Sequence, residues 1–438
     1  MVELSGSDLT TEELARILQL HKRFVEGRKD GQRADLKHRN FSGKKLRGLN
    51  LRGAVLAGCD FRGADVSGTD FSTADLFAAS FQKSTCVKSN FERADLRGTD
   101  FRGAVLNGAS FLEADLRPGQ LMMAASGRKE GPSIANKTGN VDPQGAEMVG
   151  TNLEAALLRK ANLNGANLEG ANLSHARLQG ATMRGAILAG VDLSTADLSE
   201  ALISRGASEL PVDIQRMLRS HAIWVDSSGA DGERASFAEQ DLSGAKLEGV
   251  YLSGADLRNV NLEGANLQQA LFVLADLRGA SLNGADLRRA DLSGADMSEA
   301  QLVGARLGGA KLEPISLKGA DGKSTGQQRP TKATSANLER ANCASANMRG
   351  VVFENANLTR AVLDGAIMTR AKLAGANLSQ ARFKQTDLTD AQLENANVEH
   401  ATFEFAKLRN ANLDGVETEK MHVHGADVTN TRLDKRAS

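Results

Sequence analysis

Apolar residues recur in this chain at every fifth position, a spacing that fits neither an α-helix nor an ordinary β-strand. From Leu36 to Leu116, every fifth residue is apolar: eight Leu, seven Phe, Val66 and Cys86. A small residue stands two places before most of these positions, with Ala at nine of the seventeen, and Gly often stands two places after the apolar residue. The unit therefore reads A-(D/N)-L-x-G. Because one phase holds through seventeen units, the pattern indicates a repeat architecture.

This unit resembles that of the pentapeptide-repeat family, and the resemblance covers most of the chain. It implies an all-β solenoid, a right-handed quadrilateral β-helix of pentapeptide repeats with short capping helices. Each unit forms one side, and four units make a coil. The Leu or Phe and the preceding small residue point inward, where a narrow coil has no room for a larger neighbour. Gly permits the positive φ that some tight turns require.

Phe residues spaced ten apart fit a four-sided coil. Ten residues are two sides, so successive Phe residues lie on opposite walls and meet across the axis. We expect one wall to hold Phe61, Phe81 and Phe101 and the opposite wall to hold Phe71, Phe91 and Phe111. The two walls between them are expected to carry Leu, Val66 and Cys86.

The chain also looks duplicated. Residues 14–25 and 214–225 carry the same helical apolar face at an offset of 200, and each precedes a run of seventeen units, the second of them ending at Leu317. Thr10 and Glu13 form a capping-box pattern, and Pro211 suits a first helical turn. The expected organisation is an N-terminal helical cap at 1–35, a repeat module at 36–203 with an insert at 117–147, a second helical cap at 204–236, a second module at 237–433 with an insert at 318–335, and a tail at 434–438.

The two helical caps have a physical purpose in this scheme. The first coil of a solenoid exposes unpaired backbone and an apolar cross-section, and an amphipathic helix laid over that end covers both. The cap residues are expected to be Leu18, His21 and Phe24 in the first segment and Leu218, His221 and Trp224 in the second. Both His residues lie on the apolar face, so we interpret them as packing residues.

Motifs that carry chemistry are scarce. The stretch GADGKST (319–325) suggests a phosphate-binding loop, but Leu317 stands where that motif needs Gly, so a linker is the better interpretation. His422 and His424 flank an inward Val423 without a third ligand nearby, which favours an exposed pair over a metal site. We expect no catalytic, cofactor-binding or metal-binding residues, no cofactor, and no enzymatic activity.

The charge balance bears on possible partners. The chain has 54 Lys and Arg against 54 Asp and Glu, and the three longest runs have net charges of only +3, −4 and −1. Some family members imitate DNA with an acidic rod and bind DNA gyrase, but duplex DNA carries one negative charge per roughly 1.7 Å. The runs carry far less negative charge than DNA, so a DNA-mimicking, gyrase-binding protein is kept only as the alternative hypothesis. Direct nucleic-acid binding is not expected, because the chain has no net positive charge.

The leading hypothesis is a non-enzymatic scaffold that binds a protein partner through loops or faces of the rod. The first insert offers candidate partner-binding residues, which are Leu121, Met122, Met123, Arg128 and Lys129. Packing of this Met pair on the adjacent coil is the equal alternative. The resemblance also suggests a homodimer through the last coil. With three Cys, no secretory signal and no membrane-spanning stretch, a cytoplasmic protein is expected.

Overall fold

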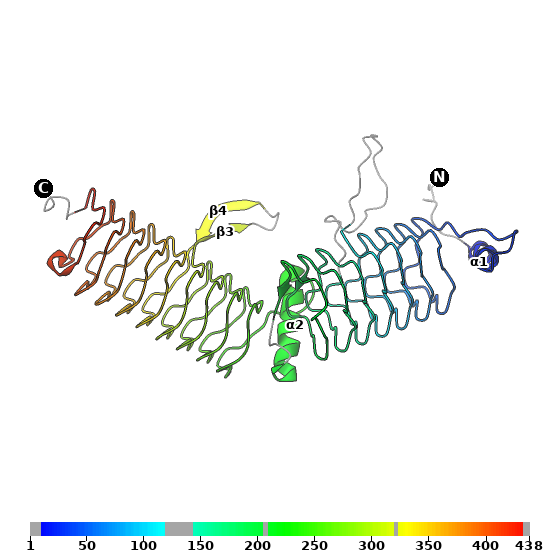
Figure 1. Cartoon of the computed structure of the whole chain (residues 1–438), viewed down its shortest axis with the longest axis horizontal. Coiled ribbons are helices and arrows are strands. Elements are labelled where there is room, and N and C mark those ends of the chain that lie inside the picture. Colours follow the sequence, from blue (N-terminus) through cyan, green and yellow to red (C-terminus); the bar gives the residue numbers. More distant parts are fainter. Residues whose placement is uncertain (1–9, 119–142, 205–208, 319–322, 432–438) are drawn as a thin grey trace, which may run out of the picture. The chain divides into compact units, whose positions relative to one another are not determined.

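The computed structural model describes residues 10–118, 143–204, 209–318 and 323–431 (Figure 1). The chain forms two compact units, unit 1 at Met1–Ile203 and unit 2 at Ser204–Ser438. Unit 1 contains α1 (Thr11–Val25) and the parallel pair β1 (Thr182–Met183) and β2 (Leu202–Ile203). Unit 2 contains α2 (Val212–Asp226), the antiparallel pair β3 (Ile315–Lys318) and β4 (Ser324–Arg329), and the 3-10 helix η2 (Thr418–Lys420).

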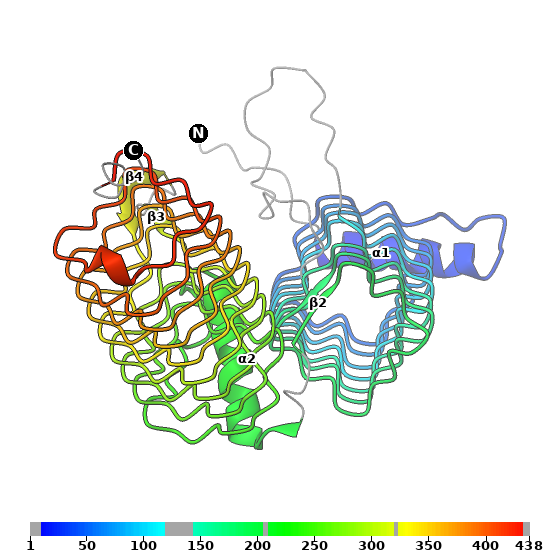
Figure 2. The same cartoon turned by 60° about the vertical axis from the view of Figure 1, so that its left-hand side comes forward.

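Each unit is a stack of coils joined by parallel bridges between residues twenty positions apart. In unit 1, Asp35 bridges Val55, which bridges Asp75, and unit 2 repeats the arrangement from Ser236 onward. Figure 2 shows unit 1 nearly along its axis, where the coils trace a four-sided outline. Twenty residues over four sides give the five-residue period of the sequence, so the quadrilateral β-helix predicted from that period is present in both units.

Aromatic rings fill the axis of unit 1. Phe61, Phe81 and Phe101 stack along one wall with ring centroids 4.6 and 5.1 Å apart. The opposite wall carries a second stack, in which Phe91 lies 5.1 Å from Phe71 and 4.8 Å from Phe111. Rings of the two walls meet edge to face at 5.7–5.9 Å. All six side chains are fully buried, in the geometry that aromatic pairs prefer.

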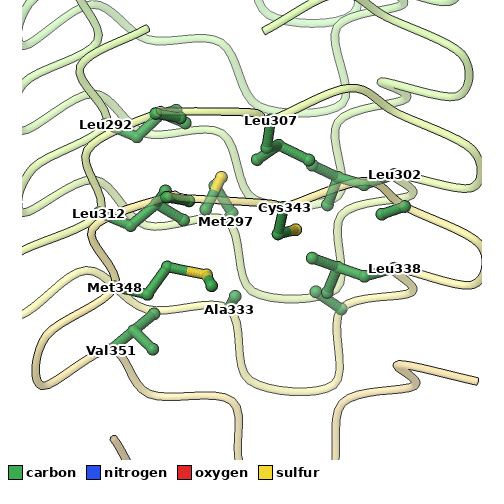
Figure 3. Close-up of a cluster of buried hydrophobic side chains, with 14 of the residues drawn as sticks. Leu292, Met297, Leu302, Leu307, Leu312, Ala333, Leu338, Cys343, Met348 and Val351 are labelled. Atoms are coloured by element: carbon green, nitrogen blue, oxygen red, sulfur yellow. The ribbon is translucent and has the colours of Figure 1, made fainter. Parts of the chain in front are cut away.

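Unit 2 fills the same interior mainly with aliphatic side chains. Figure 3 shows one part of this core, where Leu302, Leu307 and Leu312 of one coil face the axis together with Met297. The next coil continues the same walls with Leu338, Cys343 and Met348, all fully buried. The core is therefore continuous across the segment between Leu312 and Ala333.

The coils turn their corners through left-handed backbone. The residue two places after the core residue has a positive φ, such as Gly63 at 62° and Arg93 at 54°. This conformation costs a residue with a Cβ roughly 1–2 kcal/mol, which explains why Gly is frequent there. Pro, whose φ is fixed near −65°, cannot adopt it.

Two Pro residues occupy this corner position, and both mark an exit from the coil. Pro118 follows Leu116 by two places, and Pro314 follows Leu312 in the same way. After Pro314 the chain forms the hairpin β3–β4, and Asp296 bridges Lys332, 36 positions on, instead of a residue twenty positions on. A corner that requires positive φ ends the coil when Pro occupies it.

These exits correct the expected insert boundaries. Leu317 was expected to be the last core residue of its run, but it lies in β3, because Pro314 has already ended the coil. The repeat resumes at Lys332, inside the expected insert 318–335. In unit 1, Gly103 donates to the carbonyl of Gln144, so residues 144–147 already belong to the coil and the insert ends before 147.

A helix precedes each of the two repeat runs, and the capping signal of the first helix is confirmed. Thr10 Oγ1 accepts the Glu13 amide at 3.2 Å and the Thr10 amide donates to Glu13 at 3.0 Å, so the predicted capping box is present. Pro211, which was expected in the first helical turn, is instead the N-cap of α2, one residue before the helix begins. Leu14, Ile17 and Leu18 pack against the core of unit 1, while Ile214 and Leu218 belong to the core of unit 2.

Candidate interaction surfaces

Outward Asp and Asn residues are engaged by their own coil. The residue before the core position accepts the amide of the residue after it: Asp60 Oδ1 accepts from Arg62 at 3.0 Å, and Asn337 accepts from Glu339 at 3.2 Å. In Asp-Leu-Arg units the guanidinium also binds the carboxylate, as Arg62 does in its Asp-Phe-Arg unit, with Nη2 2.6 Å from Asp60 Oδ2. Many outward polar side chains therefore bind the backbone or a neighbouring side chain of their own coil and stabilise it.

Two members of the acidic row of unit 2 are paired in this way. Asp256 and Asp276 stand on successive coils, each paired with the Arg two places on, at 2.8 and 2.7 Å. The hydrogen bond from Arg258 lowers the pKa of Asp256 to about 2. One carboxylate per coil in this row, roughly every 4.8 Å, does not reproduce the charge density of DNA, and Asp256 and Asp276 are in addition paired with Arg. This geometry disfavours the DNA-mimic alternative.

The three thiols are buried in the core. Cys59 Sγ donates to the carbonyl of Leu36 at 2.9 Å, and Cys86 Sγ lies 3.2 Å from the Ser84 hydroxyl. Burial raises the pKa of Cys59, Cys86 and Cys343 to about 12. Thiols held in the protonated form are poor nucleophiles, which agrees with their interpretation as small core residues.

His21 and His221 occupy matching places on α1 and α2. Each Nδ1 accepts a main-chain amide at 3.1 Å, that of Ala34 in unit 1 and that of Ala235 in unit 2. Each Nε2 is buried without a hydrogen-bond partner. Burial lowers the pKa of both side chains, that of His221 to about 4. They are packing residues that anchor the first coil, while Phe24 is 42% exposed.

The described residues of two motifs considered for chemistry do not support a site, and residues 319–322 of the first lie outside the described residues. Ser324 begins strand β4, where a phosphate-binding loop would require a helix. His422 and His424 are both exposed, and His424 contacts the Phe405 ring edge to face at 5.5 Å. Within the described ranges, no group of three or more His, Cys, Asp or Glu is placed to hold a metal ion. Neither α1 nor α2 is long and apolar enough to cross a membrane.

The candidate partner-binding residues of the first insert, Leu121, Met122, Met123, Arg128 and Lys129, lie outside the described residues. A different surface stands out among the residues that the structure does describe. Outward positions of the first coils of unit 2, which the repeat normally fills with polar residues, are apolar. We name these side chains, together with neighbours from α2 and β3, the apolar strip; its members are Trp224, Tyr251, Leu271, Val273, Leu274 and Ile315.

The apolar strip follows one corner of unit 2 from α2 to the hairpin. Trp224 lies over Gly254, whose Cβ position would be 3.6 Å from the indole. Leu274 occupies the same corner one coil on. Ile315 of β3 lies over the next corner, at Gly294, where a Cβ would meet Ile315 at 2.6 Å and Leu274 at 3.0 Å. Gly at these two corners gives the large side chains room to lie flat.

Unit 1 lacks this surface. The positions that match Leu271, Val273 and Leu274 hold Asp70, Ser72 and Thr73. Thr73 has the same left-handed backbone as Leu274, with φ of 55° against 61°. The coil of unit 1 therefore forms with polar residues at these positions. The sequence contained this signal in its apolar outward positions, which the search for catalytic motifs passed over.

Stacked twenty-residue coils with an inward Leu or Phe define a β-helix of pentapeptide units. A family model described as pentapeptide repeats matches eight copies, within residues 32–117, 144–205, 235–309 and 336–415. These segments cover more than half of the chain, so the protein belongs to the pentapeptide-repeat family. They leave out both α1 and α2 and the β3–β4 hairpin.

Several solved structures are similar. HetL, a pentapeptide repeat protein involved in heterocyst differentiation regulation from the cyanobacterium Nostoc sp. strain PCC 7120, is 20% identical, with 84% of this chain and 97% of HetL covered and a TM-score of 0.23. A pentapeptide repeat protein from the Arabidopsis thaliana thylakoid lumen is 30% identical over 26% of this chain and 66% of its own, with a TM-score of 0.19.

QnrB1, a plasmid-mediated fluoroquinolone resistance protein, is 17% identical over 46% of this chain and 82% of its own, with a TM-score of 0.23. TM-scores in this range carry no argument about function. No curated protein sequence matches the chain.

Proposed function

We propose that the protein is a non-enzymatic scaffold that binds a protein partner through the surface of its β-helical rods. The observation that supports this function is the contrast between its two copies of one module. Both use the same leading helix, coil and corner geometry, yet their outward residues differ, as at Asp70 and Leu271. Since the coil of unit 1 forms with polar residues at these positions, the coil geometry alone does not require the apolar residues of unit 2.

The interior offers no competing explanation among the described residues. The thiols are buried and protonated, the His side chains of α1 and α2 bind main-chain amides, and the surface carboxylates accept amide and guanidinium hydrogen bonds. These groups stabilise the coil, which leaves recognition as the role for the rest. Solenoids commonly bind partners through loops and faces of this kind.

Excision of the hairpin tests this function directly. Replacing residues 314–330 with a single Gly joins Leu312-Glu313-Gly to Thr331-Lys332-Ala333, which restores a regular five-residue unit. Thr331 and Ala333 are already buried in the coil, so we expect this variant to fold normally. The matched variant of unit 1 replaces residues 118–140 with one Gly.

The measurement is affinity capture from native lysate with quantitative mass spectrometry, followed by binding of the purified partner. We expect a protein captured by the full chain to be lost in one of the two excision variants, while both melt like the full chain. If no protein binds the full chain in reconstitution with purified components, the scaffold function is wrong.

We also propose that α1 and α2 cap the first coil of their units. Support comes from the apolar faces of both helices, which pack on the adjacent core, and from His21 and His221, which accept amides that the first coil would otherwise leave unpaired. Because surface carboxylates are paired with Arg, we expect that the protein does not inhibit DNA supercoiling by gyrase. Inhibition at sub-micromolar protein would revive the DNA-mimic alternative.

A further inference from the structure

We propose that the N-terminal end of unit 1 docks on a membrane surface that exposes anionic phospholipid headgroups. The docking site consists of the first coil, residues 36–55, and of the exposed side of α1 with the turn that follows it. This inference goes beyond the scaffold function and does not depend on it, because it concerns the surface to which the rod attaches and not the protein that the rod binds.

The first coil of unit 1 carries six cations and no carboxylate. The six are Lys37, Arg39, Lys44, Lys45, Arg47 and Arg52. The matching coil of unit 2, residues 237–256, holds one Lys and four Asp or Glu, so the net charges of the two coils are +6 and −3. Since both coils have the same pattern of bridges, the geometry of a first coil does not require these cations.

The neighbouring carboxylates do not cancel this charge. Asp35 pairs with Lys37 at 3.4 Å, and Asp65 of the second coil pairs with Arg47. The described residues 10–75, which add α1 and the whole second coil, hold 13 Lys and Arg against 9 Asp and Glu, a net charge of +4. The corresponding residues 210–276 of unit 2 hold 5 against 10, a net charge of −5. A positive excess therefore remains after every acid on these elements is counted.

Several of these cations are not engaged by a carboxylate. No ion pair is formed within the described ranges by Arg39, Lys44, Lys45 and Arg52. Arg39 and Lys44 occupy the position two places before a core residue, which one coil on is filled by the buried Cys59 and Ala64. No coil precedes the first one, so Lys44 is exposed and Arg39 is partly exposed. These cations therefore meet solvent at the end of the stack.

The positive charge forms a single layer at that end. Each of the four sides of the first coil contributes at least one of the six cations. On the second coil the outward position of every side is a carboxylate: Asp60, Asp65, Asp70 and Asp75. A nucleic acid that lay along the rod would meet these carboxylates roughly 4.8 Å beyond the cations. A planar surface across the end instead contacts the cations of all four sides, so the layer suits an anionic bilayer.

Helix α1 adds an exposed aromatic ring to the same end of unit 1 (Figure 1). Phe24 is 42% exposed and stands in the sequence between the exposed Lys22 and Lys29, which form no ion pair in the described part of the chain. The matching Trp224 of α2 lies over Gly254 instead. Helices that lie in a membrane interface combine basic residues with Phe or Trp, and charge and apolar insertion together bind a membrane more tightly than either alone.

The test is sedimentation of the full-length protein with vesicles of phosphatidylcholine alone or of equal parts phosphatidylcholine and phosphatidylglycerol. One variant carries the residues that unit 2 has at the matching positions, through Arg39→Gln, Lys44→Ala and Arg52→Ser. A second variant, Lys45→Glu, reverses one exposed outward charge. The matched control removes three exposed cations from later coils of unit 2, through Arg349→Gln, Lys372→Gln and Lys384→Gln.

We expect the protein to bind the phosphatidylglycerol vesicles and not the neutral ones. The variant with the unit 2 residues should bind them at least about tenfold more weakly, because each cation near an anionic leaflet adds to the affinity. Lys45→Glu and added salt should also weaken binding, whereas the control should bind like the full chain. Phe24→Ala should weaken binding and leave its salt dependence in place. Circular dichroism melts establish that the variants are folded.

Other outcomes would overturn the assignment. Equal binding to both kinds of vesicle, or binding that neither charge variant of unit 1 changes, would remove the first coil from the contact. If the protein ignores both vesicles but binds a labelled DNA duplex or a polyglutamate peptide through these cations, the end of unit 1 is a nucleic-acid or an acidic-protein site instead. Absence of any binding would also refute the docking site. None of these results decides the scaffold function, which depends on the captured partner.

Discussion

The two units solve one packing problem with different side chains. Unit 1 places interlocked rings along its axis, where Phe91 contacts four other Phe rings. Unit 2 fills the same positions mostly with Leu, and its Phe272 has no ring partner in the described residues, whereas Phe383 and Phe403 stack at 4.6 Å. The comparison teaches that the coil fixes only which positions point inward, and that different apolar sets fill them.

The helices α1 and α2 differ less than the cores. Each His accepts an amide of its first coil at 3.1 Å, and each stacks on the aromatic residue three places on, Phe24 in unit 1 and Trp224 in unit 2. The first coil of each stack therefore tolerates less variation than the coils in the middle of the stack. The reason is that the first coil lacks a neighbour to satisfy its amides, so a particular acceptor must do so.

Removing α2 should produce the largest effect. We expect residues 204–438 to be soluble and to melt cooperatively, whereas residues 237–438 should aggregate, because Ile214 and Leu218 no longer cover the first coil. Size-exclusion chromatography and thermal melts compare the two proteins. Equal behaviour would show that α2 is dispensable and that the capping proposal is wrong.

Emptying the ring stack should come next. Phe91→Ala is expected to destabilise unit 1 by about 3–5 kcal/mol, the usual cost of a lost core aromatic. Lys88→Ala, at an exposed corner of the same coil region, should cost under about 0.5 kcal/mol. Urea denaturation followed by circular dichroism measures both. Similar losses for the two variants would contradict the difference between inward and outward positions.

Acid should weaken the packing of α2. Since burial lowers the pKa of His221 from 6.5 to about 4, the unfolded chain binds more protons between these values, and stability falls as the pH falls through this window. The full contribution, present above pH 6.5, is on the order of 3 kcal/mol and is lost by about pH 4.

His221→Gln is the control for this titration. The Gln side chain does not titrate, so the variant should be less stable at pH 7 and its stability should vary less between pH 6.5 and 4. Trp224 fluorescence reports on unfolding beside the imidazole, because the two rings stack at 5.5 Å. A pH dependence that is the same in both proteins would exclude His221 as its source.

Corner residues should give the smallest effects, in opposite directions. Gly63→Ala places a Cβ on left-handed backbone with nothing else within 4 Å, so we expect a loss of about 1 kcal/mol from the backbone alone. Lys88→Gly relieves the same strain at φ 55° and should gain a few tenths of a kcal/mol, as unfolded-chain entropy offsets part of the gain. Denaturation midpoints with an unchanged urea slope check both.

Most of the fold follows from the sequence, because one residue type at one spacing fixes each wall. The Phe positions required only the assumption of four sides. Leu317 misled the prediction because it keeps the five-residue phase, while the decisive residue is Pro314, which cannot turn the corner. A rule based on φ at the corner finds both exits, whereas a rule based on hydrophobicity does not.

The candidate surface was harder to predict. Tyr251 and Leu271 are visible as apolar residues at outward positions, but only the packing of Trp224 on Gly254 and of Ile315 on Gly294 joins them to residues from other segments. Helix α2 and the hairpin are separated from these coils along the chain, so no spacing rule connects them. Their assembly into one strip depends on where the hairpin base returns to the rod.

A rod of identical coils offers a binding partner many equivalent positions along its axis. A segment that fits one coil fits the next after a shift of roughly 4.8 Å, so uniform rows of Asp and Asn offer many equivalent positions and no preferred one. The apolar strip breaks that translational symmetry, because Trp224 ends it on one side and the hairpin ends it on the other. Trp224 and the hairpin therefore mark a single position along the rod axis, so a partner that contacts both of them can bind at that position alone.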